Sequence, residues 1–208
     1  MRAVAKTKVA ARAVARATSR EEAHTALRQE VAEELETGPV GRPANKDVDS
    51  YINDNSWRPR ALAEVQAASQ VVVASFVMDD PQLTTALCRR LNGRAPLSCS
   101  ILVDAEYFDK LSAPHQRPRL VELKRAGARV FLCQGNDGRP EFGPNGRPGC
   151  YHPKALLIDQ RVCYTGSGNF TKASKVNEEW MFRMVGPPVQ AMSDAIQQRL
   201  QNSTTRVM

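Results

Sequence analysis

The side chains best suited to chemistry lie between residues 152 and 179. His152 and Lys154 are two residues apart in a stretch typical of a β-strand, so both should face one side. Residues 166–169, Gly-Ser-Gly-Asn, form a tight turn that offers a hydroxyl, an amide and exposed backbone N–H groups. An imidazole, an ammonium group and neutral donors without an acidic triplet favour metal-free phosphoryl chemistry. His152 would act as nucleophile or acid–base and Lys154 would neutralise charge.

Asp159 follows His152 by seven residues. On a straight strand, an odd separation places this carboxylate on the opposite side from the imidazole. The spacing therefore favours a structural role for Asp159 over contact with a substrate.

The spacing also resembles a family signature. The stretch resembles HxKx4Dx6GSxN of the phospholipase D superfamily, and residues 177–179 (Asn-Glu-Glu) resemble the family's downstream Asn-x-Glu. The order of expected helices and strands from about residue 57 to 200 is similar to one domain of that family. The residues that match the signature are His152, Lys154, Asp159, Gly166, Ser167 and Asn169.

The resemblance implies a role for each matched residue. His152 would attack phosphorus and form a phosphohistidine, while Lys154, Ser167 and Asn169 would hold the phosphate oxygens. Glu179 would accept a hydrogen bond from the other imidazole nitrogen and fix its tautomer. Asp159, which the signature places in the catalytic set, would brace the loop. No metal and no cofactor are implied.

Two positions depart from the usual pattern. Pro153 occupies the x of the His-x-Lys motif and cannot donate a hydrogen bond to a strand ladder. Trp180 follows the glutamate where asparagine is common in small family members. Neither change removes a reacting atom, but Glu178 remains an alternative to Glu179.

The chain holds one His-x-Lys motif, whereas the family mechanism uses two. His24 and His115 are followed by Thr-Ala and Gln-Arg, so neither repeats the motif. We therefore expect a homodimer in which His152 of each chain meets at one shared site. One histidine would attack and its twin would protonate the leaving oxygen.

The positive charge is concentrated at the N-terminus. The net charge is +7, but residues 1–20 contain six Lys/Arg and no acid, which leaves 23 basic and 22 acidic side chains elsewhere. We expect a basic arm, helix and linker over 1–50 and a catalytic domain over 51–208. The arm is similar to an organelle transit peptide, which favours a mitochondrial location over a cytoplasmic one; it could also bind polyanions or be a solvated tail.

Other sequence features limit the class of protein. The longest apolar run, Val71–Met78, is strand-sized, so no transmembrane helix is expected. Five cysteines without a CxxC pair indicate free, mostly buried thiols in a reducing intracellular compartment and no zinc site.

Helical and strand patterns alternate after Trp57. Helices are expected over 60–69, 82–92, 117–126 and 188–200, and strands over 71–77, 98–103, 129–133, 151–158, 162–164 and 179–185. A further helix is expected over 20–36, before a linker at 37–50. The pattern predicts an α/β sandwich with a central mixed, mainly parallel sheet flanked by helices, as in the phospholipase D fold.

A glycine- and proline-rich segment at 135–149 precedes the His152 strand and could form a lip over the substrate. Residues 110–150 hold eight Lys/Arg and three acids, which suits a polyanion. We therefore expect metal-independent hydrolysis of phosphodiesters in phospholipids of the cardiolipin type or in nucleic acid. The alternatives are an endonuclease without lipid activity and a non-catalytic polyanion-binding module.

Overall fold

The computed structural model describes residues 47–109, 114–135, 149–201 and 205–208. The chain divides into two compact units, residues 1–45 and 46–208, and the account below concerns the second. The expected basic arm, the helix at 20–36 and most of the segment at 135–149 lie outside the described residues.

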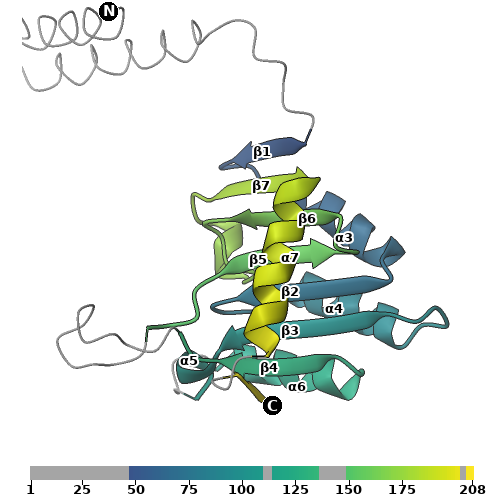
Figure 1. Ribbon diagram of the computed structural model, residues 1–208, viewed down its shortest axis with the longest axis vertical. Helices are drawn as coiled ribbons and strands as arrows, with labels where there is room; N and C mark the ends of the chain where they lie inside the picture. Colours follow the sequence, from purple (N-terminus) through teal and green to yellow (C-terminus); the bar gives the residue numbers. More distant parts are fainter. Residues whose placement is uncertain (1–46, 110–113, 136–148, 202–204) are drawn as a thin grey trace, which may run out of the picture. The chain divides into compact units, whose positions relative to one another are not determined.

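The second unit is built on one eight-stranded sheet, with the order β1-β7-β6-β5-β2-β3-β4-β8 (Figure 1). The outermost strands of this order, β1 and β8, were not expected from the sequence. The strands are β1 (Val48–Ile52), β2 (Gln70–Ser75), β3 (Ser98–Asp104), β4 (Arg129–Cys133), β5 (Lys154–Ile158), β6 (Val162–Gly166), β7 (Trp180–Val185) and β8 (Thr205–Val207).

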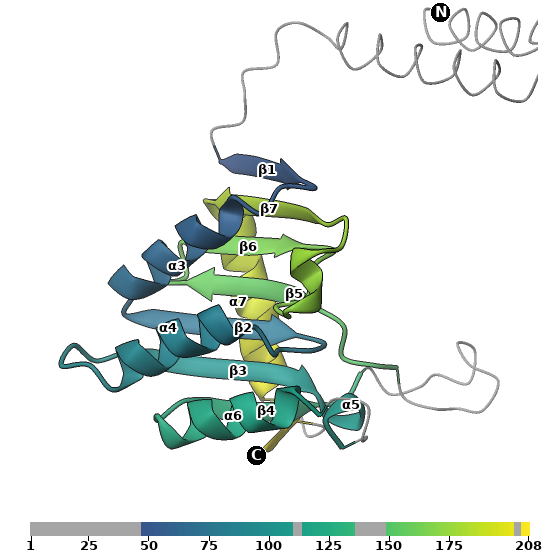
Figure 2. The ribbon, with the colours of Figure 1, turned by 180° about the vertical axis from the view of Figure 1, so that it is seen from behind.

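Helices cover both faces of the sheet. Figures 1 and 2 show α3 (Trp57–Ala67), α4 (Pro81–Leu91) and α6 (Gln116–Arg125) on one face and α7 (Pro187–Leu200) across the other. The short elements α5 (Ala105–Asp109) and η2 (Ala173–Lys175) lie in connections. None of the described helices combines the length and apolar character needed to cross a membrane.

The predicted α/β sandwich with a mixed sheet is confirmed, but its parallel part is smaller than expected. Only β2 with β3 and β3 with β4 pair in parallel, because each connection between them contains a helix on the same face. The pairs β2–β5, β5–β6 and β6–β7 are antiparallel. A tight turn at residues 159–161 joins β5 to β6, whereas a longer connection that contains η2 joins β6 to β7.

The central strands are buried on both faces, as the continuous apolar run at residues 71–77 predicted. Val71 and Val73 of β2 belong to the core beneath α3, α4 and α6, whereas Val72 and Ala74 belong to the core beneath α7. This rigid centre matters for function because the ends of β2 and β3 define the edge at which the candidate site lies.

The two end strands carry weaker sequence signals. β1 falls partly in the expected linker at 37–50, and its alternate side chains are exposed because it pairs only with β7. β8 has three residues and pairs only with β4. Short, half-exposed strands are stabilised mainly by pairing with a neighbouring strand. Their own sequences show little apolar periodicity, so the sequence did not predict them.

The expected free thiols are confirmed. Cys99, Cys133 and Cys163 are buried, Cys88 is half-buried and Cys150 is exposed, and none is in a disulfide. Burial raises the pKa of Cys99 and of Cys163 to about 12, so both stay protonated and inert at neutral pH.

Candidate active site

The candidate site lies at the edge of the sheet where β2 and β3 end. Lys154 begins β5 opposite Ser75, the last residue of β2, because the two strands run antiparallel. β6 returns beside β5, with Thr165 opposite Ala155, so the turn after Gly166 lies at the same edge. The topology thus brings the histidine motif and the glycine-rich turn together, as expected.

Asp104, at the end of β3, fixes the segment that carries His152. One carboxylate oxygen accepts a hydrogen bond from the Tyr151 backbone N–H at 2.7 Å, and the other accepts one from the Tyr107 N–H at 2.7 Å. The aspartate is 2% exposed, and charge-assisted bonds of this kind are among the stronger ones in proteins. Asp104 is therefore a functional support that the sequence analysis missed.

Phe76 holds the same segment from the side of β2. Its backbone N–H donates to the Pro153 carbonyl at 3.1 Å, and its ring centroid lies 5.0 Å from that of the His152 imidazole. The Phe76 carbonyl accepts from the Asp104 N–H at 3.5 Å, on the β3 side, so it has a partner that does not depend on an N–H from Pro153. Pro153 thus precedes the strand without leaving an unpaired group opposite it.

His152 and Lys154 converge as their spacing predicted. The Lys154 ammonium nitrogen lies 2.9 Å from Nδ1 and 3.2 Å from Nε2 of His152, and it also donates to the His152 carbonyl at 3.3 Å. An ammonium group can donate only to an unprotonated ring nitrogen, so which of the two nitrogens accepts depends on the tautomer of the imidazole. His152 itself is exposed and accessible to a substrate.

The environment of Lys154 changes its acidity. Burial lowers the pKa of Lys154 below its ordinary value, and this effect outweighs the opposing influence of the nearby Cys150 and Glu179 charges. Partial removal from water weakens the hydration of the ammonium group and so disfavours its charged form. A phosphate oxygen would supply a partner of opposite charge.

Ser167 is held between the turn and the start of β7. Its hydroxyl donates to Glu179 Oε2 at 2.5 Å and accepts from the Trp180 N–H at 3.0 Å, while its backbone N–H donates to the Trp180 carbonyl at 2.9 Å. Gly166 makes this close approach possible, because a Cβ there would lie 1.9 Å from the Trp180 carbonyl oxygen. The glycine of the motif is thus required by packing of backbone against backbone.

Glu179, rather than Glu178, belongs to this cluster. Glu179 accepts from Ser167 and from the Asn177 side chain at 3.4 Å, whereas Glu178 is exposed and makes no hydrogen bond to any described residue. The expected hydrogen bond from His152 to Glu179 is also absent within the described part of a single chain. The carboxylate therefore stands beside the turn and not behind the imidazole of its own chain.

Asn169 ends the turn with a buried and unpaired atom. Its Oδ1 is buried without a hydrogen-bond partner among the described residues, and Phe170, which follows, is 1% exposed. Buried polar atoms normally have partners, and exceptions tend to mark sites that bind something. An amide oxygen only accepts hydrogen bonds, so the partner that this atom lacks is a donor, and a phosphate oxygen could be bound only by the Nδ2 group of the same amide.

Asp159 lies away from these residues, at the far end of β5. Five residues of strand separate it from Lys154, a span of about 16 Å. Its Oδ1 accepts from the Ser69 N–H at 2.9 Å, the Ser69 hydroxyl at 2.8 Å and the Gln70 N–H at 2.7 Å. The predicted brace is confirmed, and direct participation of Asp159 in catalysis, to which the motif alone would assign it, is not supported by this placement.

Asp159→Ala is expected to lower stability and leave the chemistry intact. Burial raises the pKa of Asp159, but the hydrogen bonds from Ser69 and Gln70 prevail and lower it, so the ionised form stabilises the fold. That stability is present above the ordinary aspartate pKa and is lost as the pH falls through the lowered value. We expect a loss of about 1–3 kcal/mol in the free energy of unfolding at pH 7, measured by urea denaturation.

The loss should shrink as the pH falls through the lowered pKa of Asp159, because the wild-type carboxylate then becomes protonated and its hydrogen bonds weaken. Asp159→Asn, which tolerates the positive φ of 51° at this turn, is the milder matched change. A variant with unchanged stability but lost turnover would contradict the role of brace.

An apolar cavity adjoins His152 on the α7 face of the sheet. It has a volume of about 370 Å³, with walls formed by the segment before β5 and by one side of α7. Its lining residues include Tyr151, Pro153, Met192, Ile196 and Arg199. The Arg199 guanidinium lies 5.4 Å from the Tyr151 ring, so one wall is charged while the others are apolar.

Comparison with known proteins agrees with the fold. The family profile described as cardiolipin synthase, PLD-like domain, matches residues 63–202. No curated protein matches the chain. The chain belongs to the phospholipase D superfamily, whose members act on phosphodiesters.

Solved structures share the fold at low sequence identity. NucT from Helicobacter pylori matches with a TM-score of 0.62 at 16% identity, over 77% of this chain and 98% of NucT. Nuc from Salmonella typhimurium, a phospholipase D family member, matches with 0.59 at 16%, over 78% of this chain and 99% of Nuc. Phosphatidylserine synthase from Haemophilus influenzae matches with 0.56 at 14%, and the aligned region covers 93% of this chain and 48% of the synthase.

Proposed function

We propose that the chain hydrolyses phosphodiesters without a metal ion, with His152 as the nucleophile. The observation that carries this proposal is the contact of the Lys154 ammonium group with the exposed His152 imidazole, beside a turn of neutral donors. Among the described residues, no group of three or more His, Cys, Asp or Glu side chains is arranged to hold a metal ion. The site offers a nucleophile and cationic binding for phosphate from the protein alone.

The proposed reaction has two steps. In the first, an unprotonated ring nitrogen of His152 forms a bond to phosphorus as the bond to the leaving oxygen breaks, and a second acid donates a proton to that oxygen. In the second, water gives its proton to the same group and attacks phosphorus, which breaks the N–P bond. Lys154, Ser167 and Asn169 would bind the non-bridging oxygens, whose charge grows in each transition state.

Among the described residues no second histidine contacts His152, so we propose a two-fold dimer. His24 lies outside the described residues. His115 is the N-cap residue of α6, beside Gln116, whose side chain accepts from the Met78 N–H after β2, and it makes no contact with His152 or Lys154 among the described residues. In a symmetric dimer the partner's His152 would protonate the leaving oxygen. The absence of a His152–Glu179 bond within one chain fits this arrangement, because Glu179 would then be free to support the partner's imidazole.

An exposed apolar surface beside Glu179 suits the dimer contact. Ile52 and Trp180 are paired across β1 and β7 and are each 58% exposed, and Val176, before β7, is 88% exposed. Single exposed apolar residues are common on protein surfaces. Here an aromatic and an aliphatic side chain are exposed together, beside a site that has one of the two histidines the mechanism needs, which suits a protein–protein interface. We expect this surface to pack against its copy.

Trp180→Lys is expected to shift the protein from dimer to monomer. Light scattering should give about twice the 23.0 kDa chain mass for the wild type and a lower, concentration-dependent mass for the variant. Turnover per chain should fall in parallel and recover at high protein concentration. Val207→Lys is the matched control, since Val207 is 71% exposed on β8, at the other end of the sheet.

A wild-type monomer with full activity would overturn the shared site. Equal loss of activity in the Val207 and Trp180 variants would show that the added charge, rather than the interface, is responsible.

The substrate proposal covers phospholipid and nucleic acid. The apolar cavity beside His152 supports a lipid of the cardiolipin type, and the basic residues of 110–150 suit either polyanion. NucT and Nuc share the fold of this chain, which keeps an endonuclease as the alternative. A polyanion-binding module without turnover is the remaining alternative.

The test is hydrolysis in the presence of EDTA. We expect turnover of bis(p-nitrophenyl) phosphate to persist with EDTA, and a parallel assay on single-stranded DNA, RNA and cardiolipin vesicles to identify the natural class. Activity abolished by EDTA would contradict the metal-free mechanism. Binding without turnover of any of the four substrates would leave the binding module as the function.

A further inference from the structure

The glycine-rich turn is anchored to the rest of the fold by the residue that follows Asn169. The Phe170 carbonyl accepts two hydrogen bonds, from the Asp79 and Asp80 N–H groups, each at 3.0 Å. Its ring is buried against Trp57, with the ring centroids 6.1 Å apart. The position of the Asn169 backbone therefore depends on the segment that leads into α4, to which the next residue, Phe170, is hydrogen-bonded.

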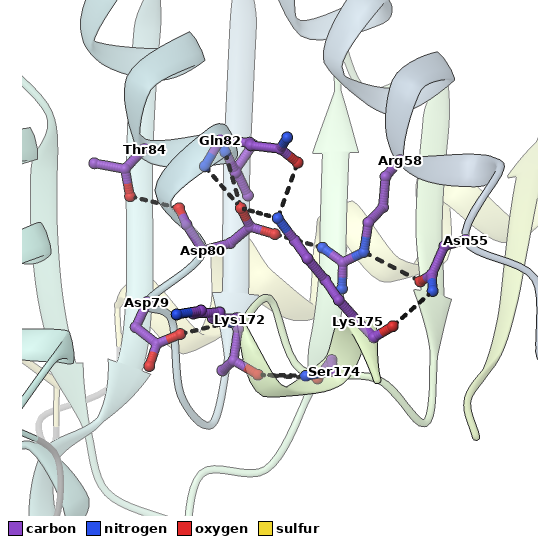
Figure 3. Close-up of polar contacts among 11 residues, drawn as sticks. Asn55, Arg58, Asp79, Asp80, Gln82, Thr84, Lys172, Ser174 and Lys175 are labelled. Atoms are coloured by element: carbon purple, nitrogen blue, oxygen red, sulfur yellow. Dashed lines mark hydrogen bonds and ion pairs between the residues drawn. The ribbon is translucent and has the colours of Figure 1, made fainter. Parts of the chain in front are cut away.

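Asp80 is the centre of this anchor (Figure 3). Its side chain caps α4 by accepting from the Gln82 and Leu83 N–H groups, and it forms a buried ion pair with Arg58. The Lys175 ammonium group lies 3.5 Å from Asp80 Oδ1. Asp80 thus binds both its own helix and the segment that follows the turn.

Other contacts fix the return of the chain toward Glu179. The Asp79 side chain accepts from the Lys172 N–H at 2.8 Å, and Lys175 donates to the Gln82 side chain at 2.9 Å. Asn55 donates to the Lys175 carbonyl at 2.9 Å. Figure 3 shows these residues gathered around one point, which lies between α3, α4 and the segment of 172–175.

Arg58 belongs to this group of residues. It is buried, which is unusual for an arginine. The residue is 8% exposed, its guanidinium lies 4.5 Å from the Trp57 ring, and its Nε donates to Asn55 at 3.4 Å. Its Nη2 is buried without a partner among the described residues, as is Asn169 Oδ1. Burial lowers the pKa of Arg58, while the charges of Asp80 and Glu179 raise it.

A buried ion pair is weak support for stability alone. Removing two charges from water is costly, and apolar or neutral replacements of such pairs are often neutral or stabilising. The pair at residues 58 and 80 instead lies directly behind the turn, within electrostatic reach of Glu179. Its contacts connect α3 and α4 to the segment that follows the turn.

We propose that Arg58, through its ion pair with Asp80, is a positioning residue that sets the phosphate-binding turn. The pair fixes Asp80, the Asp80 and Asp79 N–H groups fix the Phe170 carbonyl, and that carbonyl fixes Asn169 relative to His152. The charge of Arg58 also acts on Glu179 from inside the protein. This inference rests on the proposed function, because it assigns Asn169 to phosphate binding.

The test separates positioning from folding. Arg58→Gln alone removes the closer of the two cationic partners of the buried Asp80 charge, leaves it with the Lys175 ammonium group at 3.5 Å, and should destabilise the protein. The double variant Arg58→Gln/Asp80→Asn is neutral, keeps an N-cap residue of equal quality, and should recover much of the lost melting temperature. We nevertheless expect its kcat/KM on bis(p-nitrophenyl) phosphate to remain about 10- to 100-fold below wild type, since small displacements in a site carry such losses.

A second readout does not depend on turnover. Titration with inorganic phosphate should shift the Asn169 side-chain amide signal in the NMR spectrum of the wild type, and the double variant should need a higher phosphate concentration for the same shift. Arg60→Gln is the matched control, because Arg60 is a half-exposed cation on the same helix whose partner, Asp49, is also half-exposed. We expect wild-type turnover and phosphate affinity for it.

A double variant with the turnover and phosphate affinity of the wild type would overturn the positioning role. A phosphate-induced shift of Asn169 that weakens in the double variant would support it even if the wild type fails to hydrolyse any diester. That last result would contradict the proposed function and not this inference.

Discussion

His152→Asn is expected to lower kcat on any accepted phosphodiester by about 10⁴-fold or more, the scale seen when a catalytic nucleophile is removed. Asparagine resembles imidazole in size but cannot form the bond to phosphorus. The side chain is exposed, so the melting temperature should stay close to that of the wild type. His115→Asn, at another exposed histidine, is the control and should retain full activity.

The dimer adds a second outcome to this experiment. If both histidines serve one site, a mixed dimer of wild-type and His152→Asn chains should have nearly no activity, because it lacks either the nucleophile or the acid. Independent sites would instead give half of the wild-type turnover. Residual activity near that of the wild type in the pure variant would mean that His152 is not the nucleophile.

Lys154→Gln is expected to produce the second-largest effect, a loss of about 10²- to 10³-fold in kcat/KM. Removing one fixed donor to a developing oxyanion has this scale, and here the donor also carries a charge. Lys154→Arg keeps the charge and should lose less, although the planar guanidinium cannot reproduce both contacts to the imidazole. The measurement is steady-state kinetics on bis(p-nitrophenyl) phosphate.

The lowered pKa of Lys154 predicts where its contribution ends. An ammonium group with a lowered pKa loses its proton at a lower pH than the ordinary value of 10.5. Phosphate binding should therefore weaken as the pH rises through that lowered value, and kcat/KM should fall on an alkaline limb below pH 10.5. In Lys154→Arg this limb should vanish, and its persistence would assign it to another group.

Local patterns in the sequence were sufficient to predict that the candidate residues His152 and Lys154 lie together. Period-2 spacing placed His152 and Lys154 together, and the β-branched run at 71–77 predicted a strand buried on both faces, because each signal is contained within a few residues. The odd separation of Asp159 likewise indicated a brace. The structure bears out each of these.

The remaining features depend on contacts between distant segments. Asp104 supports Tyr151 from 47 residues away, and Arg58 meets Asp80 from 22 residues away. No periodicity encodes such pairs. The antiparallel half of the sheet was also underestimated, since strand direction follows from whether a connection is a hairpin or a helical crossover.

The hydrogen-bond partner that the family motif implied for Glu179 differs from the partners observed within one chain. The motif placed it behind His152, but the Ser167 hydroxyl and the Asn177 amide occupy it within one chain. Spacing along a sequence specifies which side chains are present, whereas the partner of a carboxylate depends on every neighbour that reaches it, including a second copy of the chain.

The central claim is a covalent bond between phosphorus and His152. The most direct measurement is rapid acid- or base-quench of the enzyme during turnover, followed by mass spectrometry of the peptide that contains residue 152, with EDTA present throughout. We predict a phosphoryl group on His152 that appears within the first turnover and is absent from His152→Asn. Turnover of the wild type with no adduct, or an adduct on another residue, would contradict the account.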